Sequence, residues 1–403
     1  MATVVLIGTL DTKGVEYAYL RERLLEHGVD VVVVDAGIHE PVGLEPDVTR
    51  GEVAGAGGAD SAELAARGDR GAAVEAMAAG AEAVIRGLYA AGRLDATLAL
   101  GGSGGTAIAT RAMRALPVGV PKVMVSTVAS GDTRPYVGAV DVTMMYSVVD
   151  IAGVNRVSAR IMTNAAAAAA GMALAAVPVL ETKPLVAATM FGVTTPCVTR
   201  ARERLEELGY EVLVFHATGA GGQSMEALAA GGFLAGALDV TTTELADDLV
   251  GGVLSAGPDR LQAAGAAGLP QVVSLGALDM VNFGPRETVP PQFEGRNLYV
   301  HNATVTLMRT TPEECAELGR RIGRKLSAAT GPTALYIPLG GISMIAGPGQ
   351  PFHDAAADEA LVSGLRETLE PAVEVHERSE EINDPGFATA MADRLHELIE
   401  ARR

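Results

Sequence analysis

Short apolar runs alternate along this chain with longer amphipathic segments. Near the amino end, Thr3 to Ile7 and Val29 to Val34 have the uninterrupted apolar character of buried strands. Between them, Val15 to His27 places leucines on one helical face and charges on the other, and Gly28 follows where glycine often ends a helix. Continuous apolar strands are typical of parallel sheets that are covered on both faces. The pattern therefore predicts a doubly wound α/β sheet with right-handed crossovers.

The alternation continues through the next hundred or so residues. Ala72 to Ala91 is predicted to be a helix, and Ala96 to Leu100 and Pro121 to Ser126 are predicted to be strands. Pro41 to Gly71 is rich in Gly, Ala and Asp, and we expect a long loop or surface excursion there.

A second series of elements follows an alanine-rich segment, Asn164 to Leu180. This segment is weakly hydrophobic and interrupted by glycine and proline, so a buried helix is favoured over a membrane span. Pro184 to Phe191 and Tyr210 to Phe215 are then predicted strands, with a helix at Val198 to Leu208 between them.

The two series resemble each other. Arg21 to Leu24 reads Arg-Glu-Arg-Leu shortly before a glycine, and Arg202 to Leu205 repeats it, although strand–helix–strand units commonly share such a pattern. With 403 residues the chain is long enough for two domains. We predict an α/β fold of two Rossmann-like parallel-sheet domains, residues 1–180 and 181–403, with the boundary near 177–184.

Composition narrows the functional classes. Hydrophobic residues make up 48% but aromatic residues only 4%, so Ala, Val, Leu and Ile must build the cores. The net charge of −18 and the absence of a basic stripe argue against nucleic-acid binding. Cys197 and Cys315 lie far apart and favour a reduced cytoplasmic protein over a disulfide scaffold. The first residues have no signal-peptide pattern, so we expect neither export nor membrane attachment.

The glycine-rich run at Gly101 to Thr106 is the strongest functional signal. It joins the predicted strand at Ala96 to Leu100 to the start of a helical segment, an arrangement that presents bare backbone N–H groups to an anion. Ser103 and Thr106 add hydroxyl donors. The run matches neither the dinucleotide nor the P-loop spacing, so it identifies no ligand by itself. A tight turn with nothing bound is the alternative.

Three other loops follow predicted strands of the first domain: Gly8 to Gly14, Asp35 to Gly37 and Ser126 to Arg134. Ligands of open parallel sheets bind at the carboxyl ends of the strands, so these loops are expected to converge on one pocket. The candidate cofactor-binding residues come from these loops and the glycine run: Gly8, Thr9, Asp11, Thr12, Lys13, Asp35, Gly101, Gly102, Ser103, Gly104, Gly105, Thr106, Ser130, Gly131, Asp132 and Arg134.

Particular roles follow from residue chemistry. Lys13 and Arg134 would neutralise phosphate charge, and Thr9 and Thr12 would donate hydroxyl hydrogen bonds. Asp35 ends a strand where dinucleotide folds place an acid on a ribose hydroxyl.

The acids allow other interpretations. Asp11 either serves the pocket or caps the following helix. Asp132, Asp141 and Asp150 are candidate Mg²⁺ ligands, whereas His and Cys show no zinc spacing.

The second domain carries candidates for proton transfer. His216, His301 and His353 stand at predicted loop ends, where Glu244 or Asp279 would orient them. Together with a substrate-binding Arg296 or Arg309, such groups would suit a hydrolase, lyase or isomerase acting on an acid. Structural histidines held by hydrogen bonds are the alternative.

The second domain also contains a glycine-rich turn that leads into a predicted helix. Gly219 to Ser224 leads into a predicted helix and is a second candidate anion cradle, and Thr241 to Glu244 begins another helix with hydroxyl caps and an early acid.

These blocks also carry a resemblance that covers nearly the whole chain. They are similar to the family of the ATP-binding N-terminal domain of the tomato tobamovirus-resistance protein. The matching blocks are Gly8 to Gly14, Gly101 to Thr106, Ser130 to Asp132, Gly192 to Pro196, Gly219 to Glu226 and Pro338 to Ser343. The resemblance implies two Rossmann-like subdomains, a homodimer, and ATP with Mg²⁺ in the first subdomain.

Three functional hypotheses result. The first is a cytoplasmic ATP-binding protein, with the nucleotide held by the glycine-rich loops. The second is a nucleotide-responsive binding module without turnover. The third is a metabolic enzyme that acts on a carboxylate or phosphorylated small molecule at an interdomain cleft, using the histidines of the second domain.

Overall fold

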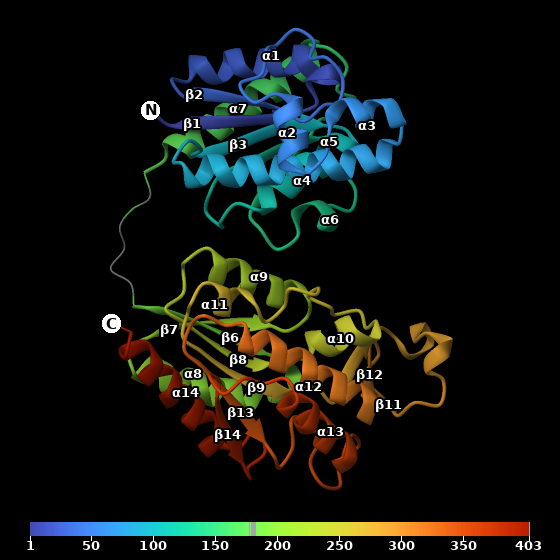
Figure 1. Cartoon of the computed structure of the whole chain (residues 1–403), viewed down its shortest axis with the longest axis vertical. Helices are drawn as coiled ribbons and strands as arrows, with labels where there is room; N and C mark the ends of the chain where they lie inside the picture. The colour runs from blue at the N-terminus through green and yellow to red at the C-terminus, as the bar shows by residue number, and fades with distance from the viewer. Residues whose placement is uncertain (177, 179–182, 403) are drawn as a thin grey trace. The chain divides into compact units, whose positions relative to one another are not determined.

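The computed structural model describes residues 1–176, 178 and 183–402. The chain divides into two compact units, Met1–Val179 (unit 1) and Leu180–Arg403 (unit 2) (Figure 1). Each unit has a parallel sheet of Rossmann-like topology, which confirms the predicted fold class. The predicted boundary at 177–184 lies largely outside the described residues.

Unit 1 contains a five-stranded parallel sheet in the order β2-β1-β3-β4-β5. Its strands are flanked by helices in alternation along the chain. The elements are β1 (Thr3–Gly8), α1 (Leu10–Glu26), β2 (Asp30–Asp35), α2 (Arg50–Ala56), α3 (Ser61–Arg67), α4 (Arg70–Ala90), β3 (Ala96–Gly101), α5 (Ser103–Arg114), β4 (Lys122–Ser126), α6 (Arg134–Val137), β5 (Val142–Tyr146) and α7 (Arg156–Leu174).

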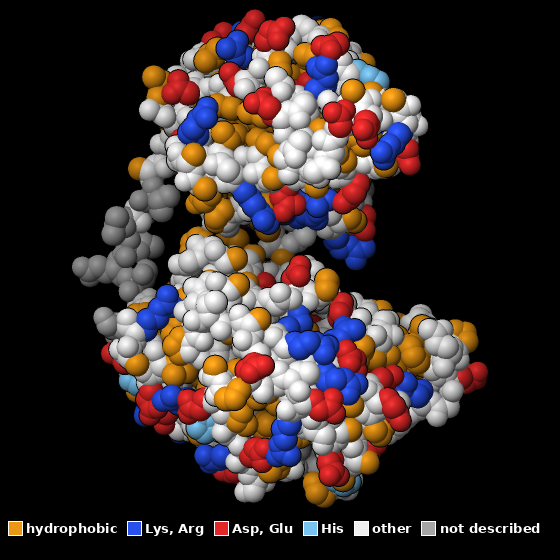
Figure 2. All heavy atoms as spheres, viewed as in Figure 1, with side chains coloured by type: hydrophobic (Ala, Val, Ile, Leu, Met, Phe, Trp, Pro, Cys, Tyr) orange, Lys and Arg blue, Asp and Glu red, His pale blue; other side chains and the backbone are white. Residues whose placement is uncertain are grey.

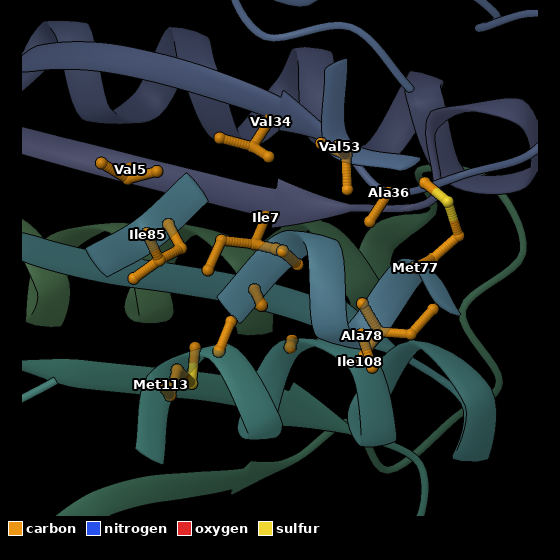
Figure 3. Packing of buried hydrophobic residues seen from close by; sticks show 14 of the residues in the cluster. Val5, Ile7, Val34, Ala36, Val53, Met77, Ala78, Ile85, Ile108 and Met113 are labelled. Atoms are coloured by element: carbon orange, nitrogen blue, oxygen red, sulfur yellow. The ribbon is translucent and has the colours of Figure 1, made fainter. Parts of the chain in front are cut away.

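Helices cover both faces of this sheet (Figure 1). One face packs against α1 and α7, and the other packs against α2, α4 and α5. On the second face, Val5 and Ile7 of β1 meet Ile85 of α4 and Met113 of α5 (Figure 3). Small and branched side chains fill both layers, as a chain poor in aromatic residues requires.

The prediction of a long loop at Pro41 to Gly71 was wrong, because two short helices and the start of α4 lie there. Thr49 and Glu52 form a reciprocal capping box at the start of α2. The Asp60 carboxylate accepts hydrogen bonds from the first N–H groups of α3. Thr-x-x-Glu is a recognised helix-start pattern, so the sequence contained this signal.

Unit 2 contains a six-stranded parallel sheet in the order β14-β13-β9-β8-β6-β7. Short 3-10 turns lie at Gly192–Thr194, Arg286–Thr288 and Pro291–Phe293. The elements of the sheet and its covering helices are β6 (Leu185–Met190), α8 (Thr195–Glu207), β7 (Glu211–His216), α9 (Ala220–Ala230), β8 (Gly236–Thr241), α10 (Glu244–Val250), α11 (Ala263–Ala266), β9 (Gln271–Gly276), α12 (Pro312–Ser327), β13 (Thr333–Pro338), α13 (Ala355–Arg366), β14 (Glu374–Arg378) and α14 (Pro385–Glu400).

The two sheets share one connection pattern. In each unit the second strand of the series lies outside the first, and the third strand lies on the other side of the first. β6, β7, β8, β9 and β13 therefore correspond in order to the five strands of unit 1, with β14 added at one edge. The repeated strand–helix pattern of the sequence thus corresponds to a repeated topology.

Unit 2 also has a small antiparallel sheet that the sequence did not predict. It contains β10 (Met280–Phe283), β12 (Val305–Arg309) and β11 (Leu298–Asn302), with β12 in the middle. His301 lies within β11, so the prediction that it stands at a loop end of the parallel sheet was wrong.

Candidate functional site

The sheet of unit 1 has its topological switch point between β1 and β3. From β1 the chain proceeds to β2 on one side and later to β3 on the other, so the loops after β1 and β3 diverge over opposite faces. The hydroxyl of Tyr17 lies between the strand ends, 2.9 Å from both the carbonyl oxygen and the backbone nitrogen of Leu100. Open α/β sheets bind their ligands in the crevice at such a point.

A cavity of about 750 Å³ occupies this position. Thr9 reaches it from the loop after β1 and Lys13 from the first turns of α1. Gly37, Gly102 and Thr127 reach it from the loops after β2, β3 and β4. Its volume is within the range of small-molecule sites. The structure thus brings residues from all four predicted loops to one cavity, although the loop from Ser126 to Arg134 contributes only Thr127.

The cavity has an apolar wall and a polar wall. Ala73, Val74 and Met77 of α4 and Ile108 of α5 form the apolar wall, which continues into the core below (Figure 3). Hydroxyls, backbone and charged groups from the strand-end loops form the polar wall.

The glycines at the start of α5 have an unexpected property. None of Gly101, Gly102, Gly104 and Gly105 has a positive φ, so the turn does not need them for its conformation. A Cβ built on Gly102 would lie 3.8 Å from Thr127 Oγ1, and a Cβ on Gly105 would lie 3.7 Å from a carbonyl oxygen, both ordinary contacts. Only Gly101 is packed tightly, with a Cβ position 3.0 Å from the backbone of α5. The other three leave the first turn of α5 bare toward the cavity.

No described side chain caps the start of α5, whose N-cap residue is Gly102. The first N–H groups of a helix have no partner within it, and they carry the positive end of the helix dipole. The beginning of α1 differs, because the Asp35 carboxylate accepts a hydrogen bond from Leu10 N at 3.1 Å.

This bond gives Asp35 a role other than the predicted ribose contact. Asp35 is fully buried, does not line the cavity, and also accepts a hydrogen bond from Gly37 N at 2.9 Å. Burial raises the pKa of its carboxyl, while these N–H groups lower it. Asp35 therefore fixes the loops after β1 and β2 to each other.

Asp11 is not the helix cap that was one of its two interpretations. Its Oδ2 accepts hydrogen bonds from the backbone N–H groups of Ile38 and His39, both at 3.1 Å. Its Oδ1 is buried without a hydrogen-bond partner among the described residues. Asp11 lines the cavity together with Asp150.

Several other predicted residues lie away from the cavity. Gly8 is packed under the ring of Tyr17, and Thr106 is buried with its hydroxyl 2.7 Å from Ser126 Oγ. Ser130, Gly131, Asp132 and Arg134 are exposed and do not line the cavity. Arg134 pairs with Asp132 at 2.7 Å and lowers the pKa of that carboxyl to about 2, so it does not supply the phosphate-neutralising charge expected of it.

Two cations do line the cavity. The Lys13 ammonium donates a hydrogen bond to the carbonyl oxygen of Ile151, in the segment between β5 and α7. Arg70, the first residue of α4, was missed because its segment was expected to be a loop. Asp69 before it is the N-cap of α4, and an Asp ahead of an alanine-rich run is a detectable helix start.

The corresponding place in unit 2 is filled by the protein itself. Glu244 begins α10 and is fully buried, and its Oε1 accepts hydrogen bonds from Gly219 N at 2.7 Å and Gly222 N at 3.1 Å. The predicted second anion cradle is therefore occupied by an internal carboxylate. Burial raises the pKa of Glu244, whereas the Arg260 guanidinium, with Nε 2.6 Å from Oε2, lowers it.

The predicted catalytic set of unit 2 does not converge. His216 is exposed at the end of edge strand β7, and His301 is exposed in the antiparallel sheet. His353 lines a separate cavity of about 380 Å³ beside β13 and β14, with Nδ1 3.2 Å from the carbonyl oxygen of Ala346. Four strand spacings separate β7 from β13, roughly 19 Å. Glu244, held by Arg260, orients none of the three.

Two further predictions concern metals and cysteines. Among residues 1–176, 178 and 183–402, no group of three or more His, Cys, Asp or Glu side chains is arranged to hold a metal ion. Asp141, a candidate Mg²⁺ ligand, pairs instead with Lys122 at 2.8 Å. Cys197 and Cys315 are buried free thiols, and burial raises the pKa of both.

In the described part of the chain, every helix is too short or too polar to cross a membrane.

Fold and cavity together define a class: an α/β protein of two units with repeated topology, in which unit 1 keeps an open cavity at its switch point. Comparison with known sequences identifies the family. Residues 2–178 match the N-terminal domain, and residues 183–399 the C-terminal domain, described as "Uncharacterised protein family (UPF0261)". The chain belongs to the UPF0261 family.

Relatives occur in bacteria and in a plant. A UPF0261 protein of Clostridium tetani is 53% identical over 399 residues, covering 98% of this chain and 99% of the relative. A UPF0261 protein of Rhizobium meliloti is 48% identical and covers 97% of both chains. The ToMV resistance protein Tm-1(GCR237) of Solanum lycopersicum is 45% identical over 313 residues, which are 76% of this chain but 42% of the tomato protein.

Similar solved structures are distant. The Streptomyces glycosyltransferase SsfS6, complexed with thymidine diphosphate, is 14% identical with a TM-score of 0.21, covering 68% of this chain and 82% of that one. A putative UDP-N-acetylglucosamine 2-epimerase of Listeria monocytogenes is 12% identical with a TM-score of 0.24, covering 96% and 93%. At these scores the likeness carries no argument about function.

Proposed function

We propose that unit 1 binds ATP with Mg²⁺ in the cavity at the β1–β3 switch point. The observation that carries this proposal is the set of glycines Gly102, Gly104 and Gly105. Neither their backbone dihedrals nor contacts with protein atoms require glycine, yet each removes a side chain from the wall that a phosphate would approach. A tight turn without a ligand offers no reason for three such positions.

The two walls of the cavity suit the two ends of a nucleotide. The apolar surface of Ala73, Val74, Met77 and Ile108 offers a dry contact for a flat base. The uncapped start of α5, the hydroxyls of Thr9 and Thr12, and Lys13 offer hydrogen-bond donors and positive charge for phosphate groups.

The acids of the cavity suit a magnesium ion. Mg²⁺ in nucleotide sites is held by one or two carboxylates together with phosphate oxygens and waters. Asp11 has a buried oxygen without a hydrogen-bond partner among the described residues, and Asp150 lines the same cavity. These two carboxylates would hold the ion, which would supply charge neutralisation at the phosphates.

The choice of ATP rests on the sequence resemblance, and a cytoplasmic homodimer belongs to the same proposal. The two free buried thiols fit a reducing compartment. Light scattering on the purified chain measures the oligomeric state.

Thermal unfolding with and without MgATP tests the binding site. A ligand at one hundred times its Kd stabilises its protein by about 2.7 kcal/mol. We expect this stabilisation in the natural chain and its loss in Gly102→Val and Gly104→Val.

The control is Gly87→Val in α4, an exposed helical glycine with open space where its Cβ would be. This variant should keep the full stabilisation. If MgATP stabilises all variants equally, the glycine run is not part of the site. If MgATP does not stabilise the natural chain, the proposal of nucleotide binding is overturned. Release of phosphate from bound ATP, measured separately, distinguishes an ATPase from a binding module.

A further inference from the structure

Arg70 is a cation of the unit 1 cavity that forms no ion pair with a protein anion in the described part of the chain. It lines the cavity of unit 1, is exposed, and has no hydrogen bond or ion pair with any described residue. The neighbouring Asp69 carboxylate is directed to Ala72 N at 3.1 Å, where it caps α4.

The basic surface of unit 2 shows the contrast. Lys and Arg side chains gather over α12 on the visible face (Figure 2). Its cations have partners: Arg321 pairs with Asp248 at 3.2 Å, and Arg324 pairs with Glu317 at 3.2 Å. Arg70, by contrast, lines the cavity of unit 1 without a carboxylate partner among the described residues.

Arg70 lies close to the positive ends of two helices. It is the first residue of α4, where the helix dipole disfavours a cation. Its Nη2 also lies 3.6 Å from the position that a Cβ on Gly104 would take, so it faces the positive start of α5. Two positive ends of helices and a guanidinium therefore meet at one wall of the cavity.

We propose that Arg70 and the backbone of Gly102 to Gly105 together bind one phosphoryl group of the ligand. The inference rests on the proposed function for the position of the ligand, but it names a residue and a chemical class, the phosphate monoester or polyphosphate. The planar guanidinium donates two parallel hydrogen bonds to phosphate oxygens, which an ammonium cannot do. Because Arg70 belongs to α4, the bound phosphate connects α4 to α5 across the cavity.

Calorimetric titration with adenosine, AMP, ATP and inorganic pyrophosphate tests the assignment. In Arg70→Ala we expect the Kd for each phosphate-bearing ligand to rise at least about tenfold, while the Kd for adenosine changes less than about twofold. Arg70→Lys should recover part of the loss. The matched control is Arg67→Ala, an exposed arginine three residues earlier that pairs with Glu63 and does not line the cavity.

Each outcome has a distinct meaning. Unchanged phosphate affinity in Arg70→Ala, or an equal loss for adenosine, overturns the inference and leaves nucleotide binding standing. The natural chain could bind pyrophosphate through Arg70 and bind none of the nucleotides more tightly than pyrophosphate. In that case the proposed function fails and the phosphoryl subsite stands. A general effect of surface charge would appear equally in Arg67→Ala and would also overturn the assignment.

Hydrogen exchange gives a readout independent of affinity. ATP should slow exchange in the first turns of both α4 and α5 in the natural chain. In Arg70→Ala at saturating ATP, protection should remain in α5 and be lost in α4. Protection of α4 that survives the substitution contradicts the proposed connection.

Discussion

The two units share one sheet topology, but at the carboxyl ends of the strands unit 1 has an open cavity and unit 2 has buried side chains of its own. In unit 1 the helix after the third strand, α5, begins with glycines beside an open cavity. In unit 2 the corresponding helix, α10, begins at the fully buried Glu244, whose carboxylate enters the glycine turn before α9. The comparison teaches that a glycine turn before a helix becomes a candidate ligand site only where the protein supplies no anion of its own.

The internal anion of unit 2 needs an internal cation. Arg260 is fully buried and pairs with Glu244 through Nε at 2.6 Å and with Asp239 through Nη1 at 2.5 Å. In unit 1 the charged groups at this edge of the sheet are available to a ligand, whereas in unit 2 they form ion pairs with one another inside the protein.

The largest expected effect is in Arg260→Met, which retains volume but leaves Asp239 and Glu244 buried without their cation. Removing one partner of a buried ion pair costs about 3–5 kcal/mol. Hydrogen exchange resolved by segment should show unit 2 destabilised by this amount and unit 1 unchanged. Arg321→Met, which removes a half-exposed pair, is the control and should have little effect. A stable unit 2 in Arg260→Met would mean that the ion network is not what fills this edge of the sheet.

The next effect is a pH dependence confined to unit 2. Burial raises the pKa of Asp247 in α10 to about 7, although hydrogen bonds from Asn282 and Leu254 oppose the rise. The unfolded carboxyl titrates near its ordinary value, so the folded unit binds a proton that the unfolded chain releases. The contribution of this carboxyl to the stability of unit 2 is therefore greatest at low pH and falls as the pH rises from about 4 to about 7, by at most about 4 kcal/mol.

The free energy of unfolding of the natural chain and of Asp247→Asn, measured at about pH 5 and about pH 8, gives the contribution of this carboxyl. The asparagine variant should lose most of the difference between the two pH values, because it stays neutral at both. A pH dependence that persists unchanged in Asp247→Asn would assign it to other groups, such as Asp279, whose pKa burial raises to about 6.

The smallest and sharpest test uses one substitution in each unit. A Cβ on Gly222 would lie 2.1 Å from Glu244 Oε2, so Gly222→Ala should destabilise unit 2 by about 1–3 kcal/mol. A Cβ on Gly104 has its nearest neighbour at 3.6 Å, so Gly104→Ala should be neutral or stabilise unit 1 by up to about 1 kcal/mol. Segment-resolved hydrogen exchange compares the two directly. Equal destabilisation in both units would remove the distinction between a filled turn and an open one.

Much of the fold was predictable because local pattern determines it. Apolar runs predict the strands at Thr3–Gly8 and Ala96–Gly101, and a terminating glycine predicts the end of the helix before Gly28. These local signals do not depend on contacts with distant parts of the chain. The helices at Arg50–Ala56 and Ser61–Arg67 escaped prediction because they are short and alanine- and glycine-rich, so their capping residues carry most of the signal. The antiparallel sheet escaped prediction because its middle strand, β12, pairs with β10 as well as with the neighbouring β11, and a pairing between strands that are not consecutive leaves no local pattern.

The candidate site, too, has features that the local sequence predicted and features that only the tertiary structure showed. The sequence by itself determined that glycine loops end two strands of unit 1, and which loops could meet. Only the tertiary structure decided that Thr9, Lys13 and Gly102 share a cavity while Asp132 and Arg134 neutralise each other outside it.

The same division explains the two glycine turns. Gly101 to Thr106 and Gly219 to Ser224 read alike along the chain, since both join a strand to a helix. The difference between them is a carboxylate twenty-two residues from Gly222, carried by another helix. Local sequence specifies the turn, but long-range packing specifies whether its N–H groups meet a side chain of the protein or remain open to a ligand.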